Sequence, residues 1–224
     1  MALYDPPLTL LSRAGQLAEG ALALSSGAYF DAASTAGALA PALLIAFLAG
    51  VSEMAGQSVI LVLNRAPIYR FAASLAYTGG IYLLQALVWG LAVMAVAPLA
   101  RADVLHAGYA GLFTVIAMSY APRLFGVFAI APYFGQGISQ FLDAWMMTSV
   151  IFGLHAATGV PLAAAGIVGL AGWLAAFLAR TLISRLLRAP LRRLRRLVSG
   201  SGLDLTPEQL LHRFGHVRTE REEP

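Results

Sequence analysis

The sequence predicts an all-α protein, a polytopic bundle of about five transmembrane helices with flanking amphipathic helices. Apolar residues make up 59% of the chain, charged residues make up 12%, and the mean hydropathy is +0.74. Soluble domains average about 45–50% apolar and about 25% charged residues. Between Ala36 and Ile183 only scattered charges interrupt the apolar sequence. Uncharged apolar runs of about 18 residues or more are typical of membrane-spanning helices.

The first 35 residues predict an N-terminal amphipathic segment at the membrane interface. From Pro7 to Leu24, apolar residues recur at helical spacing and the polar residues fall on the opposite side. Tyr29, Phe30 and Asp31 then predict an interfacial approach to the first span. The N-terminus lacks a positively charged region, so we expect no cleaved signal peptide.

Residues 36–183 predict the transmembrane bundle, and its first three spans follow from runs and breaks. The first span is expected at Pro41–Leu63 and the second at Phe71–Val96. The third region, Val104–Pro132, is long enough to span but contains Pro122. Because proline removes a helical hydrogen bond and clashes with the preceding turn, we expect a kink or break there.

Two further spans are expected at Ile138–Ala157 and Leu162–Ala179, joined by a tight turn over residues 158–161. A break at Pro122 that divides the third region into two segments would give six segments instead of five. Five crossings place the first loop and the C-terminus on the same side of the membrane. Since Arg65, Arg70 and most other arginines lie in those two segments, the C-terminus is expected in the cytoplasm.

Residues 184–198 predict a basic amphipathic helix directly after the last span, and residues 199–224 a flexible polar tail. The helix is a candidate contact for anionic lipid headgroups. It equally fits a topology signal that only holds the last span in place, or a contact for a partner. The candidate lipid contacts are Arg185, Arg188, Arg192, Arg193, Arg195 and Arg196.

A candidate intramembrane polar site comprises Glu53, Gln57, Arg123 and Asp143. An ionisable residue within a span is costly, and is by default a hypothesis for function. Glu53 shares a helix face with Gln57, so we expect it to point into the bundle. Its expected partner is Arg123, and Asp143 is a second candidate neighbour. Three roles stay open at this point: structural pairing, an ion or ligand pathway, and interfacial snorkelling.

The sequence predicts neither an enzyme nor a cofactor. It contains no cysteine, which excludes thiolate nucleophiles, disulfides and cysteine-based metal sites. Zinc-protease, serine-hydrolase and phosphate-loop motifs do not occur in it. The arginines of the tail are not interleaved with aromatic residues, so nucleic-acid binding is not expected.

Diffuse motifs over about residues 40–180 resemble the Yip family. They are Tyr120-Ala121-Pro122, the stretch from Ile130 to Gly135, the end of the fourth span at 153–159, and the segment 50–65, which resembles bacterial and cyanobacterial members. Yip proteins are five-span membrane proteins named for their interaction with Ypt/Rab GTPases. The resemblance implies a non-catalytic protein of the bacterial cytoplasmic or thylakoid membrane. It also implies a cytoplasmic N-terminus, whereas the arginine distribution places that end outside.

Two functions are therefore expected as alternatives. The first is a non-catalytic integral membrane protein that organises membranes or scaffolds a membrane partner complex. The second is a small ion- or proton-coupled transporter or channel that uses Glu53 and Asp143. The expected partners are membrane lipids together with a protein partner or a second copy of the chain.

Overall fold

The computed structural model describes residues 7–57, 68–100, 102–131 and 133–186, and every regular element within them is helical. The predicted all-α class is confirmed over these ranges. The chain divides into two units, Met1–Leu182 and Ile183–Pro224. Nearly all of the described residues belong to the first unit, and of the second unit only the end of the last helix is described.

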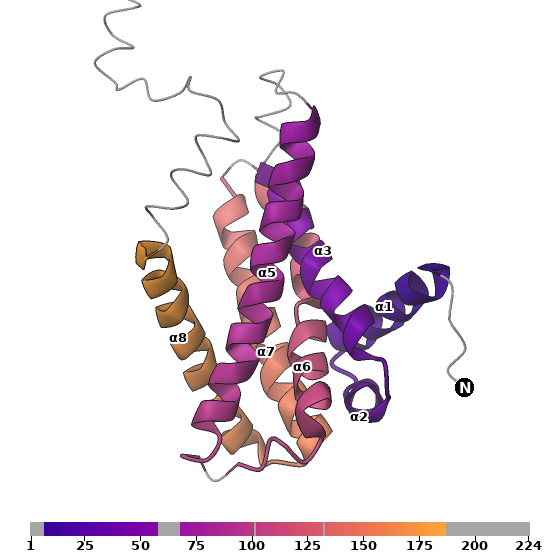
Figure 1. Cartoon of the computed structure of the whole chain (residues 1–224), viewed down its shortest axis with the longest axis vertical. Coiled ribbons are helices and arrows are strands. Elements are labelled where there is room, and N and C mark those ends of the chain that lie inside the picture. Colours follow the sequence, from indigo (N-terminus) through magenta and orange to yellow (C-terminus); the bar gives the residue numbers. More distant parts are fainter. Residues whose placement is uncertain (1–6, 58–67, 101, 132, 187–224) are drawn as a thin grey trace, which may run out of the picture. The chain divides into compact units, whose positions relative to one another are not determined.

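Eight helical elements follow one another along the described chain (Figure 1). They are α1 (Pro7–Leu22), α2 (Ser26–Ser34), α3 (Leu39–Gln57), α5 (Ile68–Val96), α6 (Gly108–Met118), the 3₁₀ helix η1 (Ala121–Ile130), α7 (Gly135–Thr158) and α8 (Leu162–Leu186). Helix α3 packs against α5, α6 and η1, while α7 packs against η1, α6 and α2. Helix α3 also packs against α1, so it connects the N-terminal helix with α5, α6 and η1.

Three stretches are long and apolar enough to cross a membrane: Leu39–Gly56, Phe71–Val96 and Gly108–Ile130. They correspond to the first three predicted spans. Helices α7 and α8 occupy the positions of the fourth and fifth. However, α7 is less apolar, and the described apolar part of α8, Leu162–Leu178, is shorter. Five crossings therefore stay a prediction.

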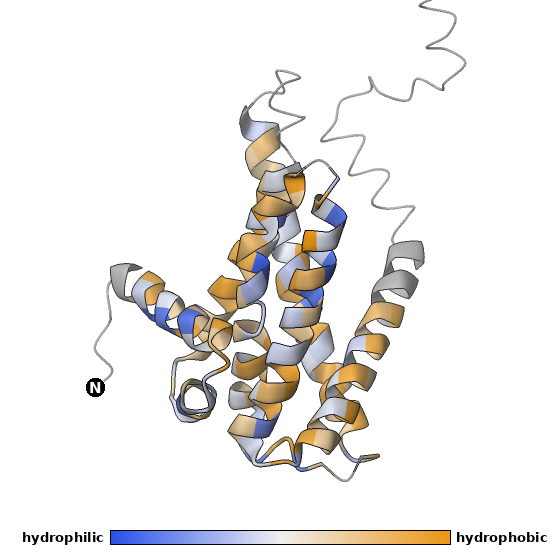
Figure 2. Cartoon of the chain, turned by 180° about the vertical axis from the view of Figure 1, so that it is seen from behind, coloured by the Kyte–Doolittle hydropathy of each residue, from blue (hydrophilic) through white to orange (hydrophobic). Residues whose placement is uncertain are grey.

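Large apolar side chains are exposed on α5 and α8. The described part of α8 is coloured mostly hydrophobic in Figure 2. Such extensive apolar exposure is rare on soluble monomers and marks contact with lipid or with another protein. The exposed residues on these two helices are Tyr69, Tyr77, Leu84, Leu87, Leu91, Leu162, Ile167, Leu170, Trp173, Leu174, Phe177 and Leu178.

Glycines bring α3, α5 and α6 into close contact. A Cβ added at Gly50 of α3 would lie 2.7 Å from the carbonyl oxygen of Thr78 on α5. One added at Gly90 of α5 would overlap the Phe113 ring of α6. Small residues that let helix backbones approach are typical of packing in lipid, where helices gain little from burying apolar surface.

The predicted break in the third region is confirmed. Helix α6 ends at Met118, and the chain continues as a ten-residue 3₁₀ helix with Pro122 in its first turn. Runs of 3₁₀ helix longer than three or four residues are uncommon, because their hydrogen bonds have poorer geometry. The length of η1 therefore requires support from neighbouring elements.

The N-terminal segment packs onto the bundle more closely than the sequence indicates. Helix α1 is present as predicted and buries Ala14, Ala18 and Ala21, on the side that contacts α3 and η1. The residues that were expected to approach the first span along the membrane interface form helix α2 instead, and its Tyr29 is fully buried. An added Cβ at Gly111 of α6 would lie 2.6 Å from the carbonyl oxygen of Ala33, so α2 lies directly against α6.

The turn between α7 and α8 forms as predicted. Gly159 ends α7 with φ 72°, the left-handed conformation that glycine adopts without strain. The His155 ring nitrogen Nδ1 lies 2.7 Å from the Val160 carbonyl oxygen and closes the turn. On the far side of the turn, Trp89 of α5 donates to the carbonyl oxygen of Gly169 at 3.3 Å, which links α8 to the bundle.

The predicted basic helix and tail fall largely outside the described residues. Arg188, Arg192, Arg193, Arg195 and Arg196 lie there, as do the Arg65 loop and the tail at 199–224. Arg185 belongs to the last turn of α8, but its side chain is outside the described part. The proposed lipid contact therefore stays a prediction.

Candidate functional site

The candidate site is built on η1, where the broken third region faces α3 and α7. Arg123 directly follows Pro122 in the first turn of η1, and its backbone N–H donates to the Tyr120 carbonyl oxygen at 2.9 Å. It lies seven residues before the end of η1, about 14 Å along a 3₁₀ helix. If Gly108–Ile130 crosses a membrane, Arg123 therefore lies well inside the roughly 30 Å hydrocarbon layer.

Ser52 of α3 supports the backbone of η1. Its hydroxyl donates to the Leu124 carbonyl oxygen at 2.7 Å and accepts from the Val127 N–H at 3.1 Å. These two groups, three residues apart, are the pair that one turn of a 3₁₀ helix would join. Because water cannot satisfy backbone groups in a lipid layer, this support stabilises the non-α geometry of η1.

Two glycines allow η1 to approach α3 at backbone distance. A Cβ at Gly126 would lie 3.1 Å from the Cα of Glu53, and one at Gly56 would lie 2.9 Å from the Val127 carbonyl oxygen. This approach places Glu53 beside the first turn of η1. The geometry of the charged residues therefore depends on these glycines as well as on Pro122.

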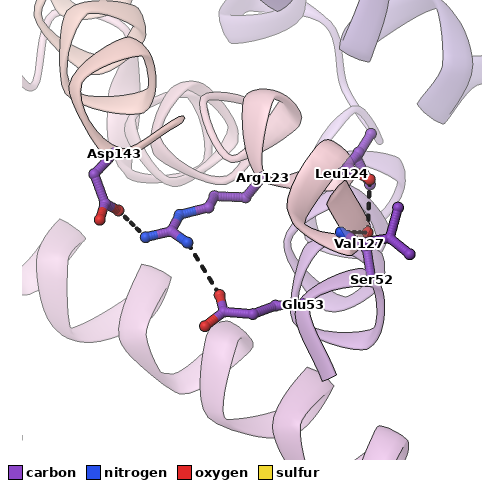
Figure 3. A network of polar contacts seen from close by, with 6 residues as sticks. All are labelled: Ser52, Glu53, Arg123, Leu124, Val127 and Asp143. Carbon is purple, nitrogen blue, oxygen red and sulfur yellow. Dashed lines mark hydrogen bonds and ion pairs between the residues drawn. The ribbon is translucent and has the colours of Figure 1, made fainter. Parts of the chain in front are cut away.

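Arg123 bridges two carboxylates from different helices (Figure 3). Its Nη1 lies 3.1 Å from Oε2 of Glu53 on α3, and its Nη2 pairs with Oδ1 of Asp143 on α7. The Arg123 side chain is 11% exposed, that of Glu53 is 23% exposed and that of Asp143 is 51% exposed. The predicted pairing of Glu53 with Arg123 is present, and Asp143 joins it.

The cluster carries an uneven charge. The side chains of Glu53, Arg123 and Asp143 sum to a formal charge of −1 when both carboxylates are ionised, and Glu53 makes a further interaction besides its pairing with Arg123. The sequence predicted one carboxylate for the arginine, whereas the structure provides two. The second, Asp143, is also the most exposed of the three, so any excess charge is most accessible there. Gln57, the fourth predicted member, ends α3, and its side chain lies outside the described part.

A second polar network joins α2, α6 and α7 through hydroxyl groups alone. The Tyr29 hydroxyl lies 3.4 Å from Oγ of Ser119 and also hydrogen-bonds Oγ of Ser149. Ser119 donates to the Val115 carbonyl oxygen at 2.7 Å. Since each hydroxyl has one proton, Tyr29 must donate to Ser119, and Ser149 must donate to Tyr29. Burial raises the pKa of Tyr29, so its hydroxyl keeps that proton.

The arrangement can hold helices together through its ion pairs and hydrogen bonds. Over the described ranges, no three His, Cys, Asp or Glu side chains come together in a way that could hold a metal ion. The structure brings together Glu53, Arg123 and Asp143 out of the predicted site residues. These three belong to three different elements, α3, η1 and α7.

Ser52, Tyr29, Ser119 and Ser149 were not predicted as site residues. A serine in an apolar helix is common and most often bonds its own preceding turn. Only the proximity of Ser119 to Pro122, and of Ser52 to Glu53, could have drawn attention to them. Tyr29 carried no such signal, because an aromatic residue before a span is expected at the membrane interface.

No model of a known protein family matches the chain, and comparison with curated proteins and with solved structures gave no significant match. The resemblance to the Yip family therefore stays a prediction that depends on diffuse sequence motifs alone.

Proposed function

We propose that the chain is a non-catalytic integral membrane protein, Yip-like in type, that organises membranes or scaffolds a membrane partner complex. The observation that supports this most is that the polar groups inside the bundle bond one another. Arg123 joins three elements through ion pairs, and Tyr29 joins three through hydroxyls. Both networks serve the assembly of the helices, and the outer faces of α5 and α8 offer apolar surface to lipid or a partner.

The proposed location is the bacterial cytoplasmic membrane or a thylakoid membrane, with the C-terminus in the cytoplasm. The arginine-rich ends of the chain support this orientation. There, the basic helix at 184–198 contacts anionic headgroups. Reporter fusions after Leu197 test the orientation: cytoplasmic activity is expected, and activity on the opposite side would overturn it.

Affinity purification in mild detergent, followed by mass spectrometry, tests the scaffold function. A scaffold is expected to retain a defined set of partners, and to retain the same set when Glu53→Gln removes one charge of the cluster. Glu19→Gln, on the exposed side of α1, is the matched control. The absence of any reproducible partner from native membranes would contradict the proposal.

One observation favours the second function, a small ion- or proton-coupled transporter. The cluster has two carboxylates for one arginine, and it lies at a broken helix, a feature of transporter binding sites. Reconstituted vesicles test this function directly. A transporter would show proton or cation flux that Glu53→Gln and Asp143→Asn abolish and Glu19→Gln preserves. We expect no such flux, and its detection would replace the scaffold function.

A further inference from the structure

The outward side of helix α7 is polar over its first turns. The exposed residues Gln136, Gln140 and Asp143 lie there, and the Asp143 side chain is 51% exposed although its Oδ1 pairs with the arginine of η1. Farther along the helix, the exposed Thr148 donates its own hydroxyl to the Ala144 carbonyl oxygen at 2.9 Å. The part of α7 that requires polar surroundings therefore extends from its start to Asp143.

Helix α8 runs back along α7 and is apolar at the same level. A Cβ added at Gly169 of α8 would lie 3.2 Å from Cγ1 of Ile151 on α7, so the two helices are in contact there. Because they are antiparallel on either side of a tight turn, Asp143 and Leu178 both lie about 12–14 Å from this contact, toward the same end. Leu178 is apolar and 58% exposed.

These two helices place opposite demands on a bilayer, and the inference rests on the membrane location in the proposed function. A carboxylate that faces hydrocarbon is costly, so Asp143 requires water or headgroups beside it. Exposed leucine and phenylalanine side chains, such as Leu178 and Phe177 on α8, are favoured in hydrocarbon instead. A flat leaflet surface cannot meet both demands, because a level that hydrates Asp143 also exposes the end of the apolar α8 surface to water.

We propose that the hydrated headgroup layer descends along the outward side of α7 as far as Asp143, so that the bilayer is thinner on this side of the bundle. The amides of Gln136 and Gln140 both donate and accept hydrogen bonds, as contact with water and lipid headgroups requires. Bilayers thin locally around charged side chains and around short hydrophobic surfaces. In the proposed orientation, the leaflet concerned is the cytoplasmic one.

This thinning gives the proposed membrane-organising function a physical means. The apolar stretch of α5, Phe71–Val96, has 26 residues and extends about 39 Å. The part of α7 beyond Asp143, from Ala144 to Thr158, extends only about 22 Å. Lipids around the bundle therefore change in thickness from one side to the other, and differences in thickness sort the proteins of a membrane.

Nitroxide side chains on single cysteines measure this directly, since the natural chain has no cysteine. Ala144→Cys on the outward side of α7 is compared with Leu178→Cys on α8, in vesicles of dioleoylphosphatidylcholine and dioleoylphosphatidylglycerol. Collisions of each nitroxide with a water-soluble nickel complex and with oxygen are measured. The nickel complex is expected to reach Ala144→Cys severalfold more often than Leu178→Cys, and oxygen to show the opposite preference.

Equal access of the nickel complex to both positions, or a preference for oxygen at both, would overturn the proposal, because the leaflet surface would then be flat. Protection of Ala144→Cys from both reagents would indicate a covering protein and would overturn it as well. Leu170→Cys, about 12 Å farther from the leaflet surface on α8, tests the membrane location separately. Oxygen is expected to reach this position and the nickel complex is not. Access of the nickel complex to Leu170→Cys would show that the membrane location itself is wrong.

A variant without the polar side chains provides a second measurement. It carries the three substitutions Gln136→Leu, Gln140→Leu and Asp143→Leu. Arg123 then keeps its pairing with Glu53, so the more buried of the two ion pairs is retained. Access of the nickel complex to Ala144→Cys should fall severalfold in this variant, whereas Gln16→Leu, on the exposed side of α1, is the control and should leave it unchanged. Unchanged access in the triple variant would contradict the proposal, because other groups would then hold the headgroup layer there.

Discussion

Two polar networks join helices in this protein, and they differ in charge and in exposure. The Arg123 cluster links α3, η1 and α7 through two ion pairs, and its Asp143 side chain is half exposed. The Tyr29 network links α2, α6 and α7 through neutral hydroxyls, and its three residues are fully buried. Both connect α7 to the rest of the bundle, at different points along its length.

This difference in charge predicts how much stability the protein loses when one residue of each network is replaced. When one hydroxyl of the neutral network is removed, the remaining hydroxyls can donate hydrogen bonds to nearby backbone carbonyl oxygens. Ser119 already donates to the Val115 carbonyl oxygen in this way. Loss of the guanidinium removes the counter-charge that Arg123 provides to two carboxylates, the largely buried Glu53 and the half-exposed Asp143. The charged network is therefore expected to be sensitive to removal of one member, and the neutral one to be tolerant.

The largest expected effect is that of Arg123→Ala. Removing one partner of a buried ion pair typically costs about 3–5 kcal/mol, and here one residue serves two carboxylates. The free energy of unfolding in mixed micelles should fall by about that amount. Glu19→Ala, on an exposed side of α1, is the control and should change it by less than about 0.5 kcal/mol. Equal effects of the two substitutions would contradict the account.

Packing around the neutral network gives the next largest effect. A Cβ added at Gly153 would lie 2.5 Å from the Tyr29 ring and 2.9 Å from Val115, whereas one added at Gly166 meets its nearest neighbour at 4.0 Å. Gly153→Ala should therefore destabilise the protein by about 1–3 kcal/mol. Gly166→Ala, also within a helix, should be neutral or slightly stabilising. Thermal unfolding of both variants checks this contrast.

Ser52→Ala is expected to destabilise the protein by about 1–3 kcal/mol, because it leaves the Leu124 carbonyl and the Val127 N–H without their partner. Hydrogen exchange should increase at the Val127 amide in particular. Ser34→Ala, which removes exposed hydroxyl bonds to the preceding turn of α2, is the control. Unchanged protection at Val127 would show that η1 does not depend on Ser52.

The smallest effect is expected for Tyr29→Phe, about 1 kcal/mol at neutral pH. Because burial raises the folded-state pKa of Tyr29 above 10.0, its protonated hydroxyl adds stability that is present below pH 10 and is lost as the pH rises further. The difference in stability between the natural protein and Tyr29→Phe should therefore shrink above pH 10. A difference that grows with pH would contradict this assignment.

Periodicity and proline predicted the helical class, the position of each main helix and the break at Pro122. The pairing of Glu53 with Arg123 was also predictable, since a charge within a span requires a partner. The bridging position of Arg123 was not, because it depends on how closely η1 approaches α3 at Gly56 and Gly126. The burial of Tyr29 was likewise unpredictable, because it follows from tertiary packing of α2 on α6 and α7, which local sequence does not encode.

The most direct test of the central claim, that Arg123 holds this bundle together by neutralising two carboxylates, is a charge-removal rescue. The free energy of unfolding is measured for Arg123→Met alone and for Arg123→Met combined with Glu53→Gln and Asp143→Asn. The single variant should lose about 3–5 kcal/mol, and the triple variant should recover most of it, because glutamine and asparagine carry no charge that Arg123 would have to neutralise. A triple variant no more stable than Arg123→Met alone would contradict the claim.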